Sequence, residues 1–192
     1  MEAGGVTPAD YVAIPVMNAV PIVTRNLKLV PHTPAHLLDL IQGADVYARS
    51  FGSAPAEGLR EFFISKDVSP EWLERLKTST TADVWTHGFG MVHNASGTVI
   101  GSAGFKGPPD TEGVVEIAYG VVPQHQGKGY ATEAARALVE FAFATGQVKR
   151  VLAHTLPQPN ASTNVLTKCG FRHVGEINDP EDGLVWRWER TQ

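Results

Sequence analysis

Cysteine is almost absent from this sequence, because Cys169 is the only one among 192 residues. A single cysteine cannot form a disulfide within the chain, so the cross-links typical of small secreted domains are excluded. This composition fits a protein of the reducing cytoplasm. Cys169 directly precedes Gly170, where a helix is expected to end. A small buried thiol is favoured there over a covalent carrier, because nothing nearby in sequence would lower its pKa.

Long apolar runs and clusters of basic residues are also missing. No stretch of about twenty apolar residues occurs, so no membrane-spanning helix is expected. Residues 1–20 lack a basic start and contain Asp10, which argues against a secretory signal. Acidic residues outnumber basic ones by 20 to 16, giving a net charge of −4. Without a basic patch no binding to nucleic acid is predicted, and the slight acidity weakly favours a cationic partner.

The sequence does contain enough apolar material for one domain. Its residues are 43% hydrophobic and 19% charged, which suffices for a single core at this length. Residues 1–20 show no hydrophobic period and are predicted to be an N-terminal arm, either flexible or packed on the surface or on a partner. Their apolar content favours the packed arm. Residues 21–190 are predicted to form the single folded domain.

The most informative stretch is residues 124–131, which contains two glycines. It follows an apolar run at 114–122 that reads as a strand ended by Pro123, and it precedes a helical pattern at 130–144. Glycines let the backbone turn tightly with successive N–H groups pointing outward. The helix adds unpaired N–H groups and the positive end of its dipole. The stretch is therefore predicted to bind an anion, in particular a phosphate or pyrophosphate.

Two familiar phosphate loops do not fit this stretch. The Walker loop has four residues between its glycines, whereas one residue separates Gly127 from Gly129, and Thr132 stands where the dinucleotide fingerprint has its third glycine. The remaining pattern, Gln-x-x-Gly-x-Gly followed by Tyr-Ala-Thr-Glu-Ala, resembles the acyl-CoA loop of the GNAT N-acetyltransferase superfamily. With Glu-Ile-Ala-Tyr at residues 116–119, it is most similar to the ribosomal-protein-alanine acetyltransferase (RimJ/RimL-like) branch.

A second motif, residues 160–171, supports the same resemblance. It is similar to the last helix of the superfamily and its Gly-Phe step into the next strand, and Gly170 stands where a left-handed residue ends a helix. The resemblance covers residues 21–190, and its specific part is 114–171. It implies an α+β fold, the GNAT fold, in which a mixed, mostly antiparallel sheet of about seven strands is flanked by helices.

The resemblance implies an enzyme that transfers acetyl from acetyl-CoA to a primary amine, either a protein N-terminus or a small molecule, by direct attack in a ternary complex without a metal. The strand at 114–122 is then expected to be bulged and to splay from the next parallel strand. The pantetheine arm would enter there and bind the amides of Val121 and Val122. The other expected CoA contacts are Gln126, Gly127, Lys128, Gly129, Tyr130, Ala131 and Thr132 around the loop, and Asn160, Asn164 and Lys168 on the last helix. Solvation at the surface is the alternative for Lys168.

Direct attack requires that the protonated amine lose a proton. Glu116 is the favoured general base, because a carboxylate inside an apolar strand is costly unless it is paired or functional. The alternatives are a structural ion pair with a basic residue, or orientation of the amine without proton transfer. His154, on the strand expected at 148–156, is a second candidate base, for which a structural role is favoured.

Two positions depart from the family pattern. Pro159 stands where many members have an asparagine that binds the pantetheine amides, so Asn160 either takes that part or only caps the helix. Leu166 stands where many members have a tyrosine that protonates the leaving thiolate. The RimJ/RimL-like branch often lacks it, and the sequence names no replacement. These departures keep open a second hypothesis, an acyl-CoA-binding sensor or interaction protein without turnover. A homodimer through a sheet edge or the arm also fits the sequence.

The remaining elements are predicted from periodicity and turn signals. They are a single strand at 22–30, helices starting at Thr33, at Gly58 and at Ser69, a hairpin of strands at 84–94 and 98–106, and a closing pair of strands at 171–177 and 184–190. His87 and His93 fall on the first strand of the hairpin. In the superfamily the region after the first strand helps to build the acceptor site. Of its aromatic residues here, at least half are expected to pack in the core instead: Tyr47, Phe51, Phe62 and Phe63.

Overall fold

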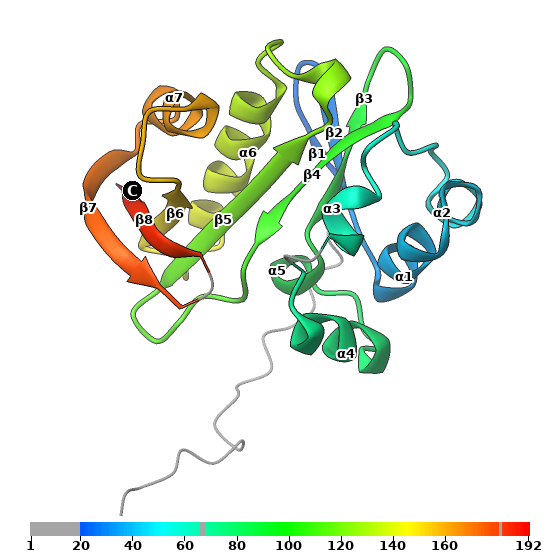
Figure 1. Ribbon diagram of the computed structural model, residues 1–192, viewed down its shortest axis with the longest axis horizontal. Helices are drawn as coiled ribbons and strands as arrows, with labels where there is room; N and C mark the ends of the chain where they lie inside the picture. The colour runs from blue at the N-terminus through cyan, green and yellow to red at the C-terminus, as the bar shows by residue number, and fades with distance from the viewer. Residues whose placement is uncertain (1–19, 66–67, 181) are drawn as a thin grey trace, which may run out of the picture.

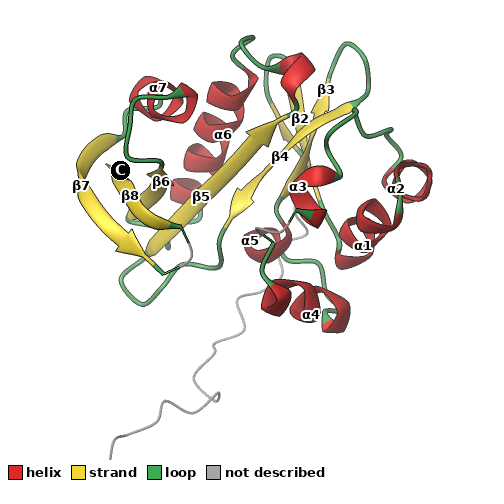
Figure 2. Ribbon diagram, viewed as in Figure 1, coloured by secondary structure: helices red, strands yellow, loops and turns green. Residues whose placement is uncertain are grey.

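The structure, a computed structural model, describes residues 20–65, 68–180 and 182–192. They form one eight-stranded sheet in the order β1-β2-β3-β4-β5-β6-β8-β7, flanked by helices (Figures 1 and 2). In the described part of the chain all neighbouring strands pair antiparallel except β5 and β6, which pair parallel. The mixed, mostly antiparallel sheet is confirmed. The predicted N-terminal arm lies outside the described residues, apart from Val20.

The elements follow one another along the chain in this order: β1 (Ile22–Val23), β2 (Leu27–Pro31), α1 (Pro34–Gln42), α2 (Ala44–Phe51), α3 (Glu61–Ile64), α4 (Pro70–Thr78), α5 (Val84–His87), β3 (Phe89–His93), β4 (Val99–Phe105), β5 (Val114–Val121), the 3₁₀ turn η2 (Pro123–His125), α6 (Tyr130–Ala144), β6 (Arg150–Thr155), α7 (Ala161–Lys168), β7 (Arg172–Asp179) and β8 (Gly183–Thr191).

The helix starts read from the sequence are confirmed at α1 and α4. Thr33 accepts a hydrogen bond from the His36 amide and Ser69 accepts one from the Trp72 amide, and each helix has proline in its first turn. The helix α2 was not predicted. It ends at Gly52, whose φ of 81° is the left-handed conformation that terminates helices.

Two predicted strands are wrong in their extent. The strand expected at 22–30 is broken into β1 and β2 by a turn in which the Thr24 amide donates to the Leu27 carbonyl over 2.8 Å. The strand expected to start at residue 84 starts at Phe89, because Asp83 caps a helical turn, α5, by accepting from the Trp85 amide. His87 therefore belongs to α5, whereas His93 ends β3 as predicted. Short apolar runs do not distinguish a strand from one helical turn.

The helix α6 forms the core with the middle of the sheet. It packs on β2, β4 and β5, as Figure 1 shows for β5. The residues that it buries are mostly small: Ala134, Ala135, Ala137, Leu138, Val139 and Ala142. Small side chains let the helix axis approach the sheet closely, which fixes the position of the first turn of α6 relative to β5.

The strands β5 and β6 separate after a short parallel stretch. Their pairing covers only Val114 to Glu116 against Arg150 to Leu152. Beyond it β5 stays paired with β4 up to Val121, and β6 stays paired with β8 up to Thr155. The predicted splay is confirmed. The predicted bulge is not seen in the pairing of β5 with β4, which keeps one register throughout. The splay arises because the parallel ladder ends.

A buried histidine makes the fold sensitive to acid. His32 is 1% exposed, its Nε2 lies 2.8 Å from the Tyr47 hydroxyl, and its ring centroid lies 5.0 Å from that of Phe51. Burial, with a smaller contribution from His36, lowers the pKa of His32 from 6.5 to about 3. The unfolded chain therefore binds the proton more readily below pH 6.5, and stability is lost as the pH falls from 6.5 toward 3.

We expect this site to contribute a slope of up to about 1.4 kcal/mol of unfolding free energy per pH unit below 6.5. Urea unfolding at several pH values would measure it, with His32→Gln reducing the slope. The exposed His173 provides the control, since His173→Gln should leave the slope unchanged. Equal slopes in wild type and His32→Gln would contradict the assignment.

Candidate active site

The glycine-rich loop between β5 and α6 has the geometry of an anion site. Gly127 and Gly129 have φ values of 74° and 86°, and Gly129 precedes α6 without any side-chain cap. The amides at the start of α6 are therefore not covered by a capping side chain. Gln126 Nε2 donates to the Val121 carbonyl over 2.8 Å, which ties the loop to the end of β5. Lys128 is exposed at the rim, where its Nζ donates to the Gln124 carbonyl.

The first turn of α6 is held from two sides. Glu133 accepts bonds from the Asn26 amide at 2.6 Å, from Asn26 Nδ2 at 2.9 Å and from the Thr24 hydroxyl at 2.5 Å. Burial alone would raise the pKa of Glu133, but these bonds outweigh it and hold the pKa below its usual value. The Tyr130 hydroxyl lies 3.0 Å from His93 Nε2. Tyr130 and Glu133 thus fix the start of α6 on either side of Ala131 and Thr132.

The amides at the end of β5 point in alternate directions. The Val122 amide donates to the Ile100 carbonyl over 3.0 Å, so it is engaged with the strand before, which differs from the expectation that it binds the pantetheine arm. Since N–H groups alternate between the two edges of a strand, the Val121 and Tyr119 amides face the splay instead. The expectation for Val121 fits this geometry, and Tyr119 supplies a second amide that sequence reasoning missed.

The last helix brings its two ends to different parts of the site. Asn160 Oδ1 accepts from the Thr163 amide over 3.1 Å and Asn160 Nδ2 donates to the Gln158 carbonyl, so Asn160 caps α7. The other end of α7 lies beside the start of α6, because the Cys169 thiol contacts the Thr132 carbonyl at 3.5 Å. Asn164 and Lys168 are both exposed on α7. Burial raises the pKa of the Cys169 thiol, which disfavours a thiolate there.

The two candidate bases lie together where the parallel ladder ends. Glu116 Oε1 is 2.8 Å from Lys106 Nζ and 3.0 Å from His154 Nδ1. The ion pair with a basic residue, one alternative from the sequence, is therefore present. Burial alone would lower the pKa of Lys106, but Glu116 raises it above its usual value. Both contacts use Oε1, so Glu116 Oε2 has no ion-pair contact with the described residues.

A tyrosine and a serine that the sequence did not single out meet across the splay. The Tyr119 side chain lies near Ser162 in the first turn of α7. Burial raises the pKa of Tyr119 well above its usual range, and the neighbouring Ser162 side chain opposes the shift only in part. The hydroxyl therefore stays protonated at neutral pH and can donate. The available signals were the tyrosine at the end of residues 116–119 and the serine in the second motif, but nothing in sequence indicated their contact.

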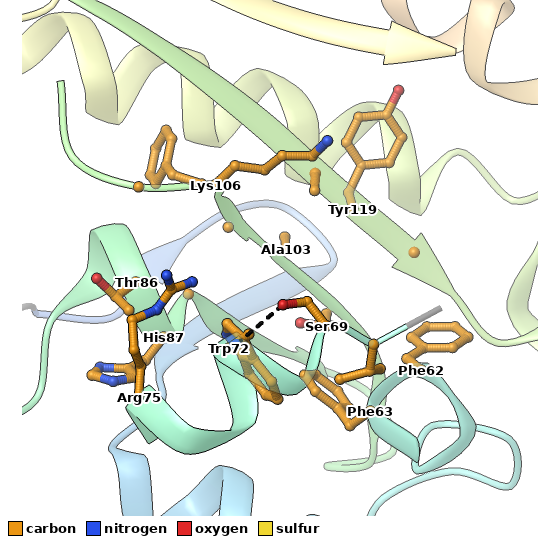
Figure 3. Close-up of a pocket in the computed structure, with 18 of the residues that line it drawn as sticks. Phe62, Phe63, Ser69, Trp72, Arg75, Thr86, His87, Ala103, Lys106 and Tyr119 are labelled. Atoms are coloured by element: carbon orange, nitrogen blue, oxygen red, sulfur yellow. Dashed lines mark hydrogen bonds between the residues drawn. The ribbon is translucent and has the colours of Figure 1, made fainter. Parts of the chain in front are cut away.

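A cleft of about 970 Å³ opens on the sheet beside this cluster (Figure 3). Its floor comes from small residues of β4 and β5, and its walls come from α3, α4 and α5. Phe62 and Phe63 line it, whereas Tyr47 and Phe51 stack on each other in or beside the core with ring centroids 4.8 Å apart. Two of the four aromatic residues thus line the cleft and the other two pack in or beside the core, in line with the expectation that at least half would be core residues. Ala118 also lines the cleft and shares its face of β5 with Glu116.

Two kinds of feature are absent from the described residues. In this part of the chain, no group of three or more His, Cys, Asp or Glu side chains is arranged to hold a metal ion. None of the helices described here is long and apolar enough to cross a membrane.

At the level of sequence, the chain matches both a family model and individual proteins. Residues 26–172 match the sequence model of the acetyltransferase (GNAT) domain. The chain is 36% identical over 73 residues to the uncharacterized N-acetyltransferase YjdG of Bacillus subtilis, covering 38% of this chain and 44% of the relative. The chain thus matches about half the length of such relatives.

Solved structures share the fold over most of the chain. The ribosomal-protein-S5-alanine acetyltransferase of Vibrio fischeri has a TM-score of 0.62 at 17% identity, covering 90% of this chain and 97% of that one. The ribosomal L7/L12 α-N-protein acetyltransferase RimL in complex with coenzyme A also has a TM-score of 0.62, at 16% identity and with 90% and 98% coverage. At these identities the likeness concerns the fold, whereas the domain match spans most of the sequence. The chain therefore belongs to the GNAT acetyltransferase domain family.

Proposed function

We propose that this protein is an N-acetyltransferase, which moves the acetyl group of acetyl-CoA to a primary amine by direct attack in a ternary complex. The observation that carries the proposal is the position of Glu116. It lies where β5 and β6 separate, on the face of β5 that lines the cleft, with the anion loop at the other end of the same strand. The strand β5 thus connects three features: the loop proposed to bind the phosphates, the splay proposed to admit the thioester, and the Glu116 carboxylate beside the proposed acceptor cleft.

The CoA contacts follow from the groups left free in the site. We assign the pyrophosphate to the backbone at residues 126–132, with Lys128 at its rim, because the uncapped start of α6 presents its amides there. The splay-facing amides of Val121 and Tyr119 are the donors available to the pantetheine arm. Lys168 lies on the end of α7 that adjoins the first turn of α6, which suits a phosphate or ribose contact, and Asn164 lies on the same exposed helix.

Glu116 is the proposed general base. Its side chain is 19% exposed against 11% for His154, and His154 Nε2 is buried without a hydrogen-bond partner among the residues described. Glu116 Oε2 is therefore better placed than the imidazole to meet an amine, directly or through a water. The carboxylate takes the proton of the ammonium group and the neutral nitrogen then attacks the thioester carbonyl. We assign His154 and Lys106 to positioning this carboxylate.

Tyr119 is the proposed proton donor for the leaving thiolate. The sequence named no group for this step, since Leu166 stands where a tyrosine is common. Tyr119 lies at the splay on the strand that also carries Glu116, is protonated at neutral pH, and has the Ser162 side chain nearby. When the C–S bond breaks, the thiolate takes the proton of this hydroxyl, and Ser162, which lowers the pKa of Tyr119, is the neighbour that can stabilise the phenolate that is left.

The acceptor, the cellular location and the oligomeric state are further proposals. The solved RimJ/RimL-type enzymes act, by their names, on ribosomal proteins, so a protein N-terminal amine and a small-molecule amine are both candidate acceptors. The cytoplasm fits the single cysteine. The strand β7 lies at an edge of the sheet and exposes Val174, which suits the sheet-edge homodimer inferred from the sequence. The alternative, a CoA-binding protein without turnover, is not favoured, because a base and a proton donor both adjoin the splay.

The direct test is acetyl-CoA turnover, read as free thiol release, with N-terminal peptides, amino acids, polyamines and aminoglycosides as acceptors. We expect turnover with one class of amine and calorimetric binding of acetyl-CoA in the same preparation. Tight binding without turnover by any amine would support the sensor hypothesis instead. Absence of acetyl-CoA binding would contradict the assignment of the loop.

A further inference from the structure

The charges that line the cleft have one sign. Among its described lining residues are the cations Arg75 and Lys106, and no aspartate or glutamate. This lining contrasts with the whole chain, which has 20 acidic and 16 basic residues. A cleft with such walls attracts anionic ligands and repels cationic ones. The composition of the chain pointed, weakly, to the opposite preference.

Arg75 is the cation available to a ligand. Lys106 is paired with Glu116 over 2.8 Å, whereas Arg75 on α4 makes no ion pair with any residue that the structure describes. Hydrogen bonds at its own backbone and from Ser69, and to a smaller extent the charge of Arg75, lower the pKa of Glu71, but no ion pair joins Glu71 to Arg75. Glu71, one turn before Arg75, accepts from the Ser69 hydroxyl, and Asp83 accepts from the Trp85 amide and the Thr86 hydroxyl. A guanidinium with five donors and no ion pair among the described residues is suited to a carboxylate or a phosphate.

Aromatic rings form the wall next to Arg75. The ring centroids of Phe63 and Trp72 are 6.2 Å apart at an interplanar angle of 33°. Phe62 lies over the floor of the cleft, where a Cβ at Gly120 would come within 2.9 Å of its ring. Phe62 therefore packs directly on the sheet at Gly120, and Phe63 and Trp72 carry the apolar wall onward to Arg75. Partly exposed rings gain from covering by an apolar ligand group.

We infer that the acceptor is a primary amine whose body combines an apolar ring with an anionic group, a carboxylate or a phosphate, bound by Arg75. Figure 3 shows Lys106 and Tyr119 across the cleft from Arg75 and Trp72. An acceptor with its anionic group at Arg75 and its ring against Trp72 and Phe63 therefore directs its amine toward Glu116. This inference rests on the proposed function, and it excludes polyamines and aminoglycosides as preferred acceptors.

Matched amine pairs test the inference. Phenylalanine against phenylalaninamide tests the carboxylate, tyramine phosphate against tyramine tests the phosphate, and spermidine serves as the cationic probe. In the wild type we expect the anionic member of at least one pair to have a kcat/KM at least tenfold above its neutral partner. In Arg75→Gln that ratio should fall to about twofold or less, through a higher KM for the anionic amine. Comparing the ratio between enzymes cancels the different basicity of the amines.

The controls separate this inference from the proposed function. Arg49→Gln removes an exposed arginine of α2 outside the cleft and should leave every ratio unchanged. A ratio that is equal in wild type and Arg75→Gln, or a preference for spermidine, overturns the inference while turnover itself upholds the proposed function.

If no amine is acetylated, the inference is tested by binding alone. Phenylalanine and tyramine phosphate are then titrated into the protein by calorimetry, with and without CoA. Binding that Arg75→Gln abolishes supports the anionic cleft although the proposed function fails. Absence of binding overturns the inference.

Discussion

Valine in place of Gly127 or Gly129 is expected to weaken acetyl-CoA binding about a hundredfold in a protein that remains folded. Both glycines have left-handed φ values, 74° and 86°, and a Cβ at either position meets no atom within 4 Å. The cost is therefore conformational, about 1–2 kcal/mol or more for a β-branched residue. The loop relieves this strain by moving its backbone, which turns its amides away from the phosphates. Hydrogen bonds to a charged group contribute about 1.5–3 kcal/mol each, so losing one or two accounts for the effect.

The same helix provides a matched control for these variants. Gly146, just beyond the other end of α6, has a φ of 71° and likewise no atom within 4 Å of a built Cβ. Gly146→Val should carry a similar strain but leave the affinity for acetyl-CoA unchanged. Calorimetric titration gives the affinity, and circular dichroism with thermal unfolding verifies the fold. Wild-type affinity in both loop variants would show that phosphates bind elsewhere.

The second large effect is expected from Glu116→Gln. We expect kcat to fall by about 100- to 1,000-fold, since a positioned general base contributes a factor of about 10²–10⁴, while the affinity for acetyl-CoA stays unchanged. Glutamine keeps the size of the side chain but cannot accept a proton, and it loses the charge that holds Lys106 and His154. Steady-state rates over a range of pH, with CoA affinity measured in parallel, would give both quantities.

Glu189 on β8 offers the control for this substitution. Its carboxylate also pairs with two cationic side chains, 2.8 Å from Arg187 and 3.6 Å from Arg150, and its side chain is 21% exposed against 19% for Glu116. Glu189→Gln should therefore change kcat by no more than about twofold, the scale of a surface ion pair. An unchanged rate in Glu116→Gln at every pH would remove the base role and leave only the structural ion pair. His154→Gln should lower kcat less than Glu116→Gln if the imidazole only positions the carboxylate.

The local features of the fold were predictable because they depend on residues close in sequence. Thr33 and Ser69 cap their helices through amides three residues away, and Asn160 caps α7 in the same way. Such short-range geometry depends only on the side chains of neighbouring residues. Where local signals compete the prediction failed, as at Val84. Its apolar run suggested a strand, but the Asp83 cap makes it helical.

The sequence by itself determined the anion loop and the helix caps, because their conformations follow from glycine and from short polar side chains acting on adjacent backbone. The tertiary structure alone decided the chemistry around them. Glu116 meets His154 only because β5 and β6 pair for a short stretch and then part. Tyr119 on β5 comes near Ser162 only because the tertiary fold brings α7 to the sheet. The net charge counts every residue of the chain, whereas only a few side chains, from segments far apart in sequence, line the cleft. An acidic protein can therefore have a cleft whose described charged lining residues are Arg75 and Lys106.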